Sequence, residues 1–235
     1  MAEVRHPADA AAAAAQLLGD ALAAALAEAR AAGPGRVTLM LSGGRTPRAV
    51  LPLLLARDLD WGRVDTLASD ERLVPPDDPD STEGMVRAGF AAAGRPLRYC
   101  APGHPDDPAA ALAAWRAEIA TLVWPPAAAL LGMGEDGHTA SLFPGRPESD
   151  PAAGAATLFA AAVPQTPPHA RARLTLGPQA LRAARCIVVI VAGAQKRAML
   201  ERACAPGADR RALPLAWIAG LPATTFLCPA EQGAA

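Results

Sequence analysis

The segment Ala127-Ala-Ala-Leu-Leu-Gly-Met-Gly-Glu-Asp-Gly-His138 joins an apolar run to a glycine-rich turn that ends in a histidine. The run Ala127–Leu131 lies between a proline and a glycine, and its length and composition are typical of a short buried strand. The glycines that follow permit sharp backbone turns. The pattern therefore predicts that Asp136 and His138 lie at the carboxyl edge of a sheet.

Three other apolar runs end in polar or glycine-rich turns. They are Val37–Leu41 before Ser42-Gly-Gly-Arg-Thr-Pro47, Val64–Ala68 before Ser69-Asp-Glu-Arg72, and Cys186–Val191 before Ala192-Gly-Ala-Gln-Lys196. Strands that alternate with helices predict an α/β, Rossmann-like fold with a mainly parallel sheet and helices on both faces. Ligands of such sheets bind beyond the carboxyl ends of the strands, near a switch in strand order. We expect the four turns to converge, although the sequence does not give the spatial order of the strands.

Composition bounds the class of protein. The chain has 235 residues, 51% of them hydrophobic and 19% charged, which predicts a single folded domain over residues 1–235. The formal net charge of −1 leaves no broad basic surface, so we expect neither nucleic acid nor a membrane as a partner. The four cysteines form no close pair of the kind that binds zinc. We read them as reduced thiols of a cytoplasmic protein, and the alanine-rich stretch Ala8–Ala32 as an amphipathic first helix rather than a membrane segment.

His138 is the candidate general base. An imidazole titrates near neutral pH and can take a proton from water, while a neighbouring carboxylate can orient it or stabilise its charged form. Asp136 and Asp70 are both candidates for that support, and the sequence does not separate their roles. The structural alternative is that Asp136 and His138 only cap a turn or a helix.

A phosphate-binding loop is predicted at Ser42-Gly-Gly-Arg-Thr-Pro47. Gly43 and Gly44 would let backbone amides approach an anion at the start of a helix. Ser42 and Thr46 supply hydroxyl groups, and we expect Thr46 to be the N-cap of that helix, with the proline at its first position. The pattern matches neither the nucleotide P-loop nor the dinucleotide glycine motif, so it predicts no nucleotide.

Two further charged groups follow predicted strands. Lys196 is the only lysine of the chain and comes just after a buried run, where a compact ammonium suits a phosphate. The acidic segment Ser69–Thr82 does not have the ligand order of an EF-hand, and we expect no metal there. Within it we expect a loop in which Asp70 is a site carboxylate and Arg72 an anion contact, while Asp77–Asp80 form turns.

Taken together, five blocks resemble 6-phosphogluconolactonases, members of the glucosamine/galactosamine-6-phosphate isomerase superfamily. The blocks are Leu41-Ser-Gly-Gly-Arg-Thr-Pro47, Ser69-Asp-Glu-Arg-Leu-Val-Pro-Pro-Asp-Asp-Pro-Asp-Ser81, Leu131-Gly-Met-Gly-Glu-Asp-Gly-His-Thr-Ala-Ser-Leu-Phe-Pro-Gly145, Arg173-Leu-Thr-Leu176 and Gly193-Ala-Gln-Lys196. They occur in the family's order, and the second and third are the most specific. The chain departs from the family at Arg45, where serine or threonine is common, and after Leu213.

The resemblance implies a sugar-phosphate isomerase type of fold and hydrolysis of 6-phospho-D-glucono-1,5-lactone to 6-phosphogluconate in the pentose phosphate pathway. It implies no metal and no cofactor, and we expect a monomer or weak homo-oligomer. The implied catalytic residues are His138, Asp70 and Asp136. The implied substrate-binding residues are Ser42, Gly43, Gly44, Arg45, Thr46, Arg72, Gly137, Arg173 and Lys196.

Two alternatives remain open at the level of sequence. In a glucosamine-6-phosphate deaminase or isomerase, a carboxylate at Asp70 would move a proton during aldose–ketose chemistry, but Arg72 stands where an aromatic residue is usual. A non-catalytic sugar-phosphate sensor would bind its ligand without turnover, but the 36 residues before the first predicted strand do not supply a persuasive DNA-binding module. Ser141 lacks the strand–turn–helix setting of a serine nucleophile, so we assign it no such role.

Overall fold

Ten strands and seven α-helices occur in a computed structural model that describes residues 1–33, 35–103, 107–150, 159–162, 171–210 and 212–230. The strands are β1 Glu3–Arg5, β2 Val37–Leu41, β3 Val64–Ala68, β4 Asp70–Arg72, β5 Arg98–Cys100, β6 Ala128–Leu131, β7 Phe159–Ala162, β8 Arg173–Leu176, β9 Ile187–Ile190 and β10 Thr224–Leu227. The helices are α1 Ala10–Ala31, α2 Arg45–Leu55, α3 Thr82–Ala92, α4 Pro108–Ile119, α5 Pro178–Ala183, α6 Ala194–Cys204 and α7 Pro214–Ala219.

Seven strands form one parallel sheet in the order β1-β10-β9-β6-β2-β3-β5. The four runs predicted to end at one site are β9, β6, β2 and β3, which are consecutive neighbours in this sheet. From β2 the chain extends to β3 and β5 on one side, and then returns to add β6, β9 and β10 on the other. The switch in strand order therefore lies between β2 and β6, where ligands of open parallel sheets bind.

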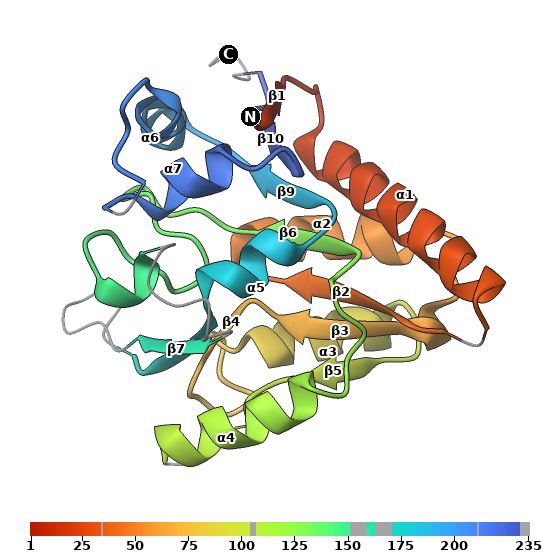
Figure 1. The fold of residues 1–235 in the computed structure, drawn as a ribbon. Coiled ribbons are helices and arrows are strands. Elements are labelled where there is room, and N and C mark those ends of the chain that lie inside the picture. The colour runs from red at the N-terminus through yellow and green to blue at the C-terminus, as the bar shows by residue number, and fades with distance from the viewer. Residues whose placement is uncertain (34, 104–106, 151–158, 163–170, 211, 231–235) are drawn as a thin grey trace.

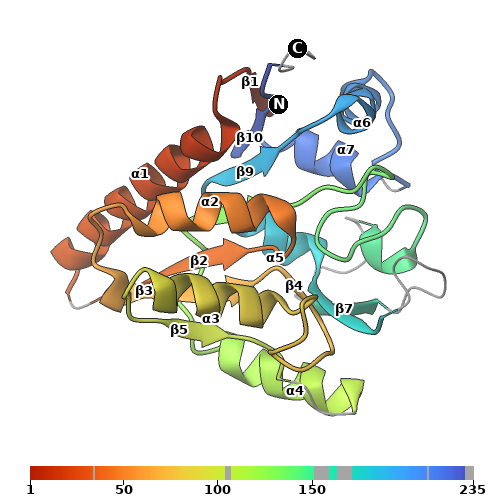
Figure 2. The same cartoon turned by 180° about the vertical axis from the view of Figure 1, so that it is seen from behind.

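Helices cover both faces of the sheet, as predicted. Helices α2 and α3 lie in front of the strands in Figure 2, and α1 packs beside α2. Figure 1 shows α4 and α5 on the opposite face. Every residue of β2, β3, β6 and β9 is buried, because strands covered on both faces have no solvent side. Their residues are mostly apolar, as this burial requires, with Thr38, Asp65 and Thr66 as the exceptions.

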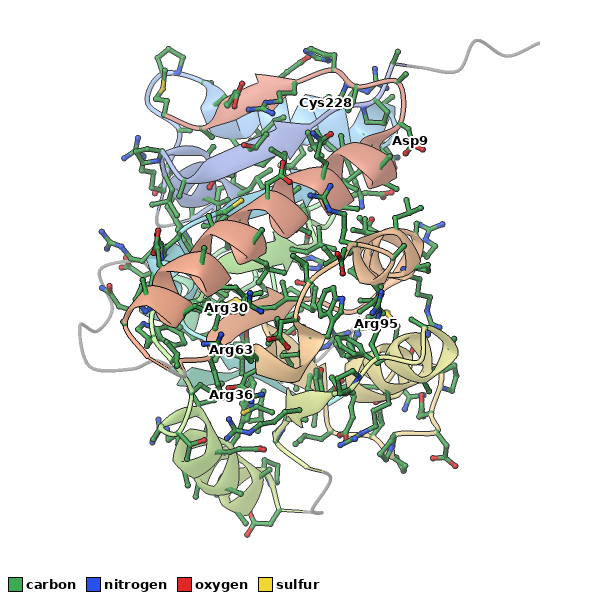
Figure 3. The ribbon with its side chains drawn as sticks, turned by 90° about the vertical axis from the view of Figure 1, so that its right-hand side faces the viewer. Asp9, Arg30, Arg36, Arg63, Arg95 and Cys228 are labelled. Carbon is green, nitrogen blue, oxygen red and sulfur yellow. The ribbon has the colours of Figure 1, made fainter. Side chains whose placement is uncertain are left out.

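Helix α1 is long and apolar enough to cross a membrane by length and composition alone. In the fold it packs against the sheet and α2, with Leu18 and Leu22 fully buried. In Figure 3, Asp9 lies at one end of this helix with Cys228 nearby, and Arg30, Arg36 and Arg63 lie toward its other end. Asp9 is its N-cap and accepts a hydrogen bond from the Ala12 amide.

A second, antiparallel sheet has the order β4-β8-β7, which the sequence did not predict. We expected Asp70–Arg72 in a loop, and this was wrong: the segment is a short strand in which Arg72 lies opposite Arg173. The strand follows β3 almost directly and brings the acidic motif against β8. The prediction failed because the pairing depends on a distant part of the chain, whereas a polar three-residue strand has no local pattern.

Candidate active site

A cavity of about 920 Å³ opens at the carboxyl ends of β2, β6 and β9, at the switch in strand order. Most of the predicted site residues line it, namely Ser42, Gly43, Gly44, Arg45, Thr46, Asp70, Arg72, His138, Arg173 and Lys196. Predicted Asp136 and Gly137 are not among its lining residues. Residues to which the sequence assigned no role in the site also line it, including Ala8–Ala11 at the start of α1 and Glu135, and Gly193 lies in the turn predicted to converge there.

His138 and Asp136 form a close pair at the turn after β6. The Asp136 Oδ1 atom lies 2.6 Å from His138 Nδ1 and accepts a hydrogen bond from the His138 amide at 3.1 Å. The Phe143 ring packs on the imidazole with centroids 4.9 Å apart. Partial burial raises the pKa of Asp136, but its hydrogen bond and charge interaction with His138 outweigh this effect and leave the pKa lowered. The carboxylate is therefore held ionised beside the ring.

Glycines allow this pair to form. A Cβ at Gly134 would collide with the His138 ring and with Asp136. Gly137 has a φ of 85°, and a Cβ there would collide with Leu213 at the start of α7. Gly137 thus packs on the start of α7, and its carbonyl accepts a hydrogen bond from the Leu215 amide.

Asp70 contacts a different set of groups. Its Oδ1 accepts from Ser69 Oγ at 2.9 Å, and its Oδ2 accepts from Ser141 Oγ at 2.6 Å. Arg173 Nη1 lies 3.9 Å from the same Oδ2 atom. The structure therefore brings Asp136, and not Asp70, into direct contact with His138.

A buried serine pair joins the strand ends at the switch point. Ser42 Oγ lies 2.7 Å from Ser69 Oγ and accepts from the Gly132 amide at 3.2 Å. The Ser42 amide donates to the Leu130 carbonyl, which continues the β2–β6 ladder. Ser42 thus ties β2, β3 and β6 together at the floor of the cavity.

Two arginines from the second sheet line the cavity beside Asp70. Arg72 Nη1 donates to the Asp80 carbonyl at 3.2 Å and to Thr82 Oγ1 at 3.5 Å. Among the described residues, the buried Nε atoms of Arg72 and Arg173 have no hydrogen-bond partner. Burial lowers the pKa of Arg173, the charge of Arg72 lowers it further, and Asp70 opposes both. The pair presents concentrated positive charge to the cavity.

The glycine loop after β2 leads into the N-terminus of α2, where backbone amides can bind an anion. Gly44 is the N-cap of α2 with a φ of 105°, a left-handed conformation that other residues adopt only with strain. A Cβ at Gly43 would collide with Thr82 and Arg72, so the loop fits closely against α3. Thr46 lies within the first turn of α2, and its prediction as the N-cap was wrong, because the left-handed glycine starts the helix earlier.

Helix α6 supplies a second glycine-capped N-terminus to the same cavity. Gly193 is its N-cap with a φ of 91°, and Lys196 lies in its first turn. Burial lowers the pKa of Lys196, the charge of Arg45 lowers it further, and Glu135 raises it. Two helix N-termini and two cations thus face one region of the cavity, an arrangement that favours a phosphate group.

Glu71 is fully buried beneath the site and fixes the start of α3. Its carboxylate accepts from three backbone amides, those of Arg72, Thr82 and Glu83, at 2.7–2.9 Å. Burial raises the pKa of Glu71 to about 7, against the lowering effect of these amides. Through Thr82 this contact also fixes the position of Arg72.

No group of three or more histidine, cysteine, aspartate or glutamate side chains gathers as a metal site within the described part of the chain. All four cysteines are free thiols, two of them buried.

The chain has a clear family relationship. The sequence pattern of glucosamine-6-phosphate isomerases/6-phosphogluconolactonase matches residues 5–226. The chain belongs to this family. A 6-phosphogluconolactonase of Pseudomonas aeruginosa is 38% identical over 184 residues, which are 75% of each protein. One of Neisseria meningitidis is 36% identical over 222 residues, covering 88% of this chain and 90% of the relative.

Solved structures of the family have the same fold. A crystal structure of a 6-phosphogluconolactonase from Shewanella baltica superposes with a TM-score of 0.79 and 27% sequence identity, over 97% of each chain. The α/β class, the mainly parallel sheet and the family resemblance predicted from the sequence are therefore confirmed. The sequence blocks that carried the resemblance are the same segments that surround the cavity.

Proposed function

We propose that this chain is a 6-phosphogluconolactonase that hydrolyses 6-phospho-D-glucono-1,5-lactone to 6-phosphogluconate in the pentose phosphate pathway. The observation that carries the proposal is the layout of the cavity. The His138–Asp136 pair lies after β6, while Lys196, Arg45 and two glycine-capped helix N-termini gather where α2 and α6 begin. A substrate with a reactive carbonyl at one end and a phosphate at the other matches both parts.

In this reaction His138 acts as the general base. With its Nδ1 proton directed to Asp136, the neutral imidazole carries its lone pair on Nε2, where it accepts a proton from water. The water oxygen forms a bond to C1 and the carbonyl electrons move onto oxygen. When the carbonyl re-forms, the bond from C1 to the ring oxygen breaks, and that oxygen takes the proton from the imidazolium. One water is thereby added across the ester, and no metal or cofactor is required.

The phosphate is remote from C1 and serves to position the ring. Amides of the loop with Gly43 and Gly44, the hydroxyl of Thr46, and the charges of Arg45 and Lys196 would hold it. Arg72 and Arg173, which neighbour Asp70, would meet the charge that develops on the carbonyl oxygen. Fixing the remote phosphate holds C1 in a defined position relative to His138, and this orientation lowers the activation barrier.

The contacts of Asp70 favour hydrolysis over aldose–ketose isomerisation. Both of its carboxylate oxygens already accept hydrogen bonds from serine hydroxyls, so it is poorly placed to shuttle a substrate proton. We expect a cytoplasmic monomer or weak homo-oligomer with no nucleic-acid or membrane partner.

The test is the initial rate of disappearance of freshly generated 6-phosphogluconolactone, coupled to 6-phosphogluconate dehydrogenase, against an enzyme-free blank for spontaneous hydrolysis. We expect a rate well above the blank and no turnover of glucosamine 6-phosphate. A rate equal to the blank, with turnover of glucosamine 6-phosphate, would assign the isomerase chemistry instead. Binding of 6-phosphogluconate with neither activity would indicate a sensor.

A further inference from the structure

Ser141 lies at the centre of the hydrogen bonds behind the cavity. Its side chain is fully buried and does not line the cavity. The hydroxyl donates to Asp70 Oδ2 at 2.6 Å and accepts a long hydrogen bond of 3.5 Å from Arg173 Nη1. Its amide donates to Thr175 Oγ1 at 3.2 Å, which ties the loop to β8. Ser141 therefore bridges the carboxylate and the guanidinium that stand beside the predicted reacting carbonyl.

The backbone before Ser141 is strained in a way that produces this contact. Ala140 has a φ of 49°, the one positive value among the described residues other than glycine. It occupies a turn closed by the Leu142 amide on the Thr139 carbonyl. The left-handed conformation is unfavourable for an alanine, because its Cβ then lies too close to the following carbonyl oxygen. Strain of this kind persists where the surrounding structure holds it, often at functional sites. Here it turns the chain so that His138 lines the cavity while Ser141 points back to Asp70.

We propose that Ser141 is a positioning residue of the hydrolytic site, acting through Asp70 and Arg173; this rests on the proposed lactonase function. Its hydroxyl fixes Asp70 and with it the Arg173 guanidinium, which lines the cavity and has an unpartnered Nε atom. The fixed guanidinium stabilises the oxyanion that forms as water attacks C1. Ser141 itself forms no bond to substrate, since its oxygen is buried and already engaged.

The experiment compares Ser141→Ala with Ser149→Ala in the coupled lactonase assay. Ser149 is a matched control because its hydroxyl is also fully buried but has no hydrogen-bond partner among the described residues. We expect Ser141→Ala to lower kcat about 10- to 100-fold with KM changed less than about threefold, because misplacement of a positioned group costs rate. Ser149→Ala should retain the parent kcat. Ser141→Cys, a weaker hydrogen-bond donor, should fall between the parent and Ser141→Ala.

A double-mutant cycle tests the route of action. In an Arg173→Lys background, which already lacks the planar guanidinium, Ser141→Ala should lower kcat less than about threefold further. Equal losses in both backgrounds, or a kcat of Ser141→Ala equal to that of Ser149→Ala, would overturn the proposal while leaving the lactonase function intact. A covalent ester on Ser141, detected by intact-mass spectrometry during turnover, would overturn it in favour of a nucleophile. A parent rate equal to the blank would overturn the proposed function and this inference together.

Discussion

At the scale of single residues, the site depends on how two carboxylates divide their contacts. Asp136 contacts His138, whereas Asp70 contacts two serines and lies near Arg173. The His138–Asp136 contact requires the aspartate to be ionised. His138 lowers the pKa of Asp136. The stabilisation from this contact is therefore complete above the ordinary pKa of an aspartate, and it is lost only as the pH falls through the lowered pKa of Asp136.

Asp136→Asn should therefore lower kcat about 10- to 100-fold with little change in KM, since a supporting group orients the base without contacting the phosphate. Steady-state kinetics with the freshly prepared lactone measures this split. Asp20→Asn is the matched control, because Asp20 pairs with Arg57 on the exposed surface of α1. A parental kcat for Asp136→Asn would show that His138 needs no carboxylate partner.

The sequence predicted most of the residues that the structure places around the cavity, but not which of them contact one another. Glycines and charged side chains after apolar runs mark the loops, because those signals are local. The contacts that Asp70 makes depend on β4, whose pairing with β8 joins residues about a hundred positions apart. The role of Ser141 was also hidden, since it follows from the left-handed backbone at Ala140, a position where the sequence shows no glycine.

At the scale of elements, two helix N-termini define the predicted phosphate region. Lys196→Ala should raise KM about tenfold and leave kcat nearly unchanged, because it removes uniform binding of a remote group. Arg202→Ala is the matched control, since Arg202 is exposed on the last turn of the same helix. A lowered kcat with an unchanged KM for Lys196→Ala would instead place the lysine at the reacting carbon.

Helix α3 is held by one buried carboxylate, which gives a pH-dependent prediction. The folded-state pKa of Glu71, about 7, lies above its ordinary value of 4.5, so the folded protein binds the extra proton between these values. The contribution of Glu71 to stability is thus complete below about pH 4.5 and is lost as pH rises through about 7. Urea unfolding of the parent at pH 5 and pH 7.5 should show this loss.

Glu71→Gln should remove the difference in stability between pH 5 and pH 7.5. It should also lower stability at pH 5, because the NH2 group of glutamine is a donor and would face backbone amides that are donors themselves. Glu148→Gln, which removes a carboxylate from a short-range pair with Arg146, should keep the parental pH dependence. An unchanged pH profile for Glu71→Gln would show that the carboxylate stays ionised throughout this range.

Most of the elements were predictable because their signals are short-range. Strands β2 and β3 match the predicted runs, β6 begins one residue later than predicted, and β9 is one residue shorter at each end. The start of α2 was predicted two residues late, because Thr46-Pro47 is a typical helix start whereas the structure has Gly44, with its positive φ, as the N-cap. The neighbour order of the strands was not predictable, since periodicity within a strand does not specify its partner.

At the scale of the whole molecule, we propose that residues 1–235 form one domain with its charged cavity and its stabilising ion pairs at opposite ends of the sheet. At the amino end of β3, Asp65 is 1% exposed and accepts from Arg36 and Arg98 at 2.6–3.0 Å. The cavity lies beyond the carboxyl ends of the same strands. Loss of Asp65 should therefore affect folding without affecting chemistry.

Asp65→Asn should lower the free energy of unfolding by about 1–3 kcal/mol, less than for a fully buried pair because both arginines reach solvent. The kcat and KM of the folded protein should stay at the parental values. Urea titrations followed by circular dichroism and by tryptophan fluorescence should give coincident transitions, as for one domain. Two separate transitions would contradict the single domain, and a changed KM would contradict the independence of the two ends.

In the proposed reaction His138 takes the proton from water, and the kcat of His138→Ala tests this step. Removal of a general base should lower kcat about 10²- to 10⁴-fold, with 6-phosphogluconate binding by calorimetry and the unfolding midpoint close to those of the parent. His6→Ala is the matched control: it removes a histidine that is hydrogen-bonded to the Cys228 carbonyl, and it should keep the parental kcat. A kcat of His138→Ala equal to that of the parent would remove His138 as the base and contradict the mechanism.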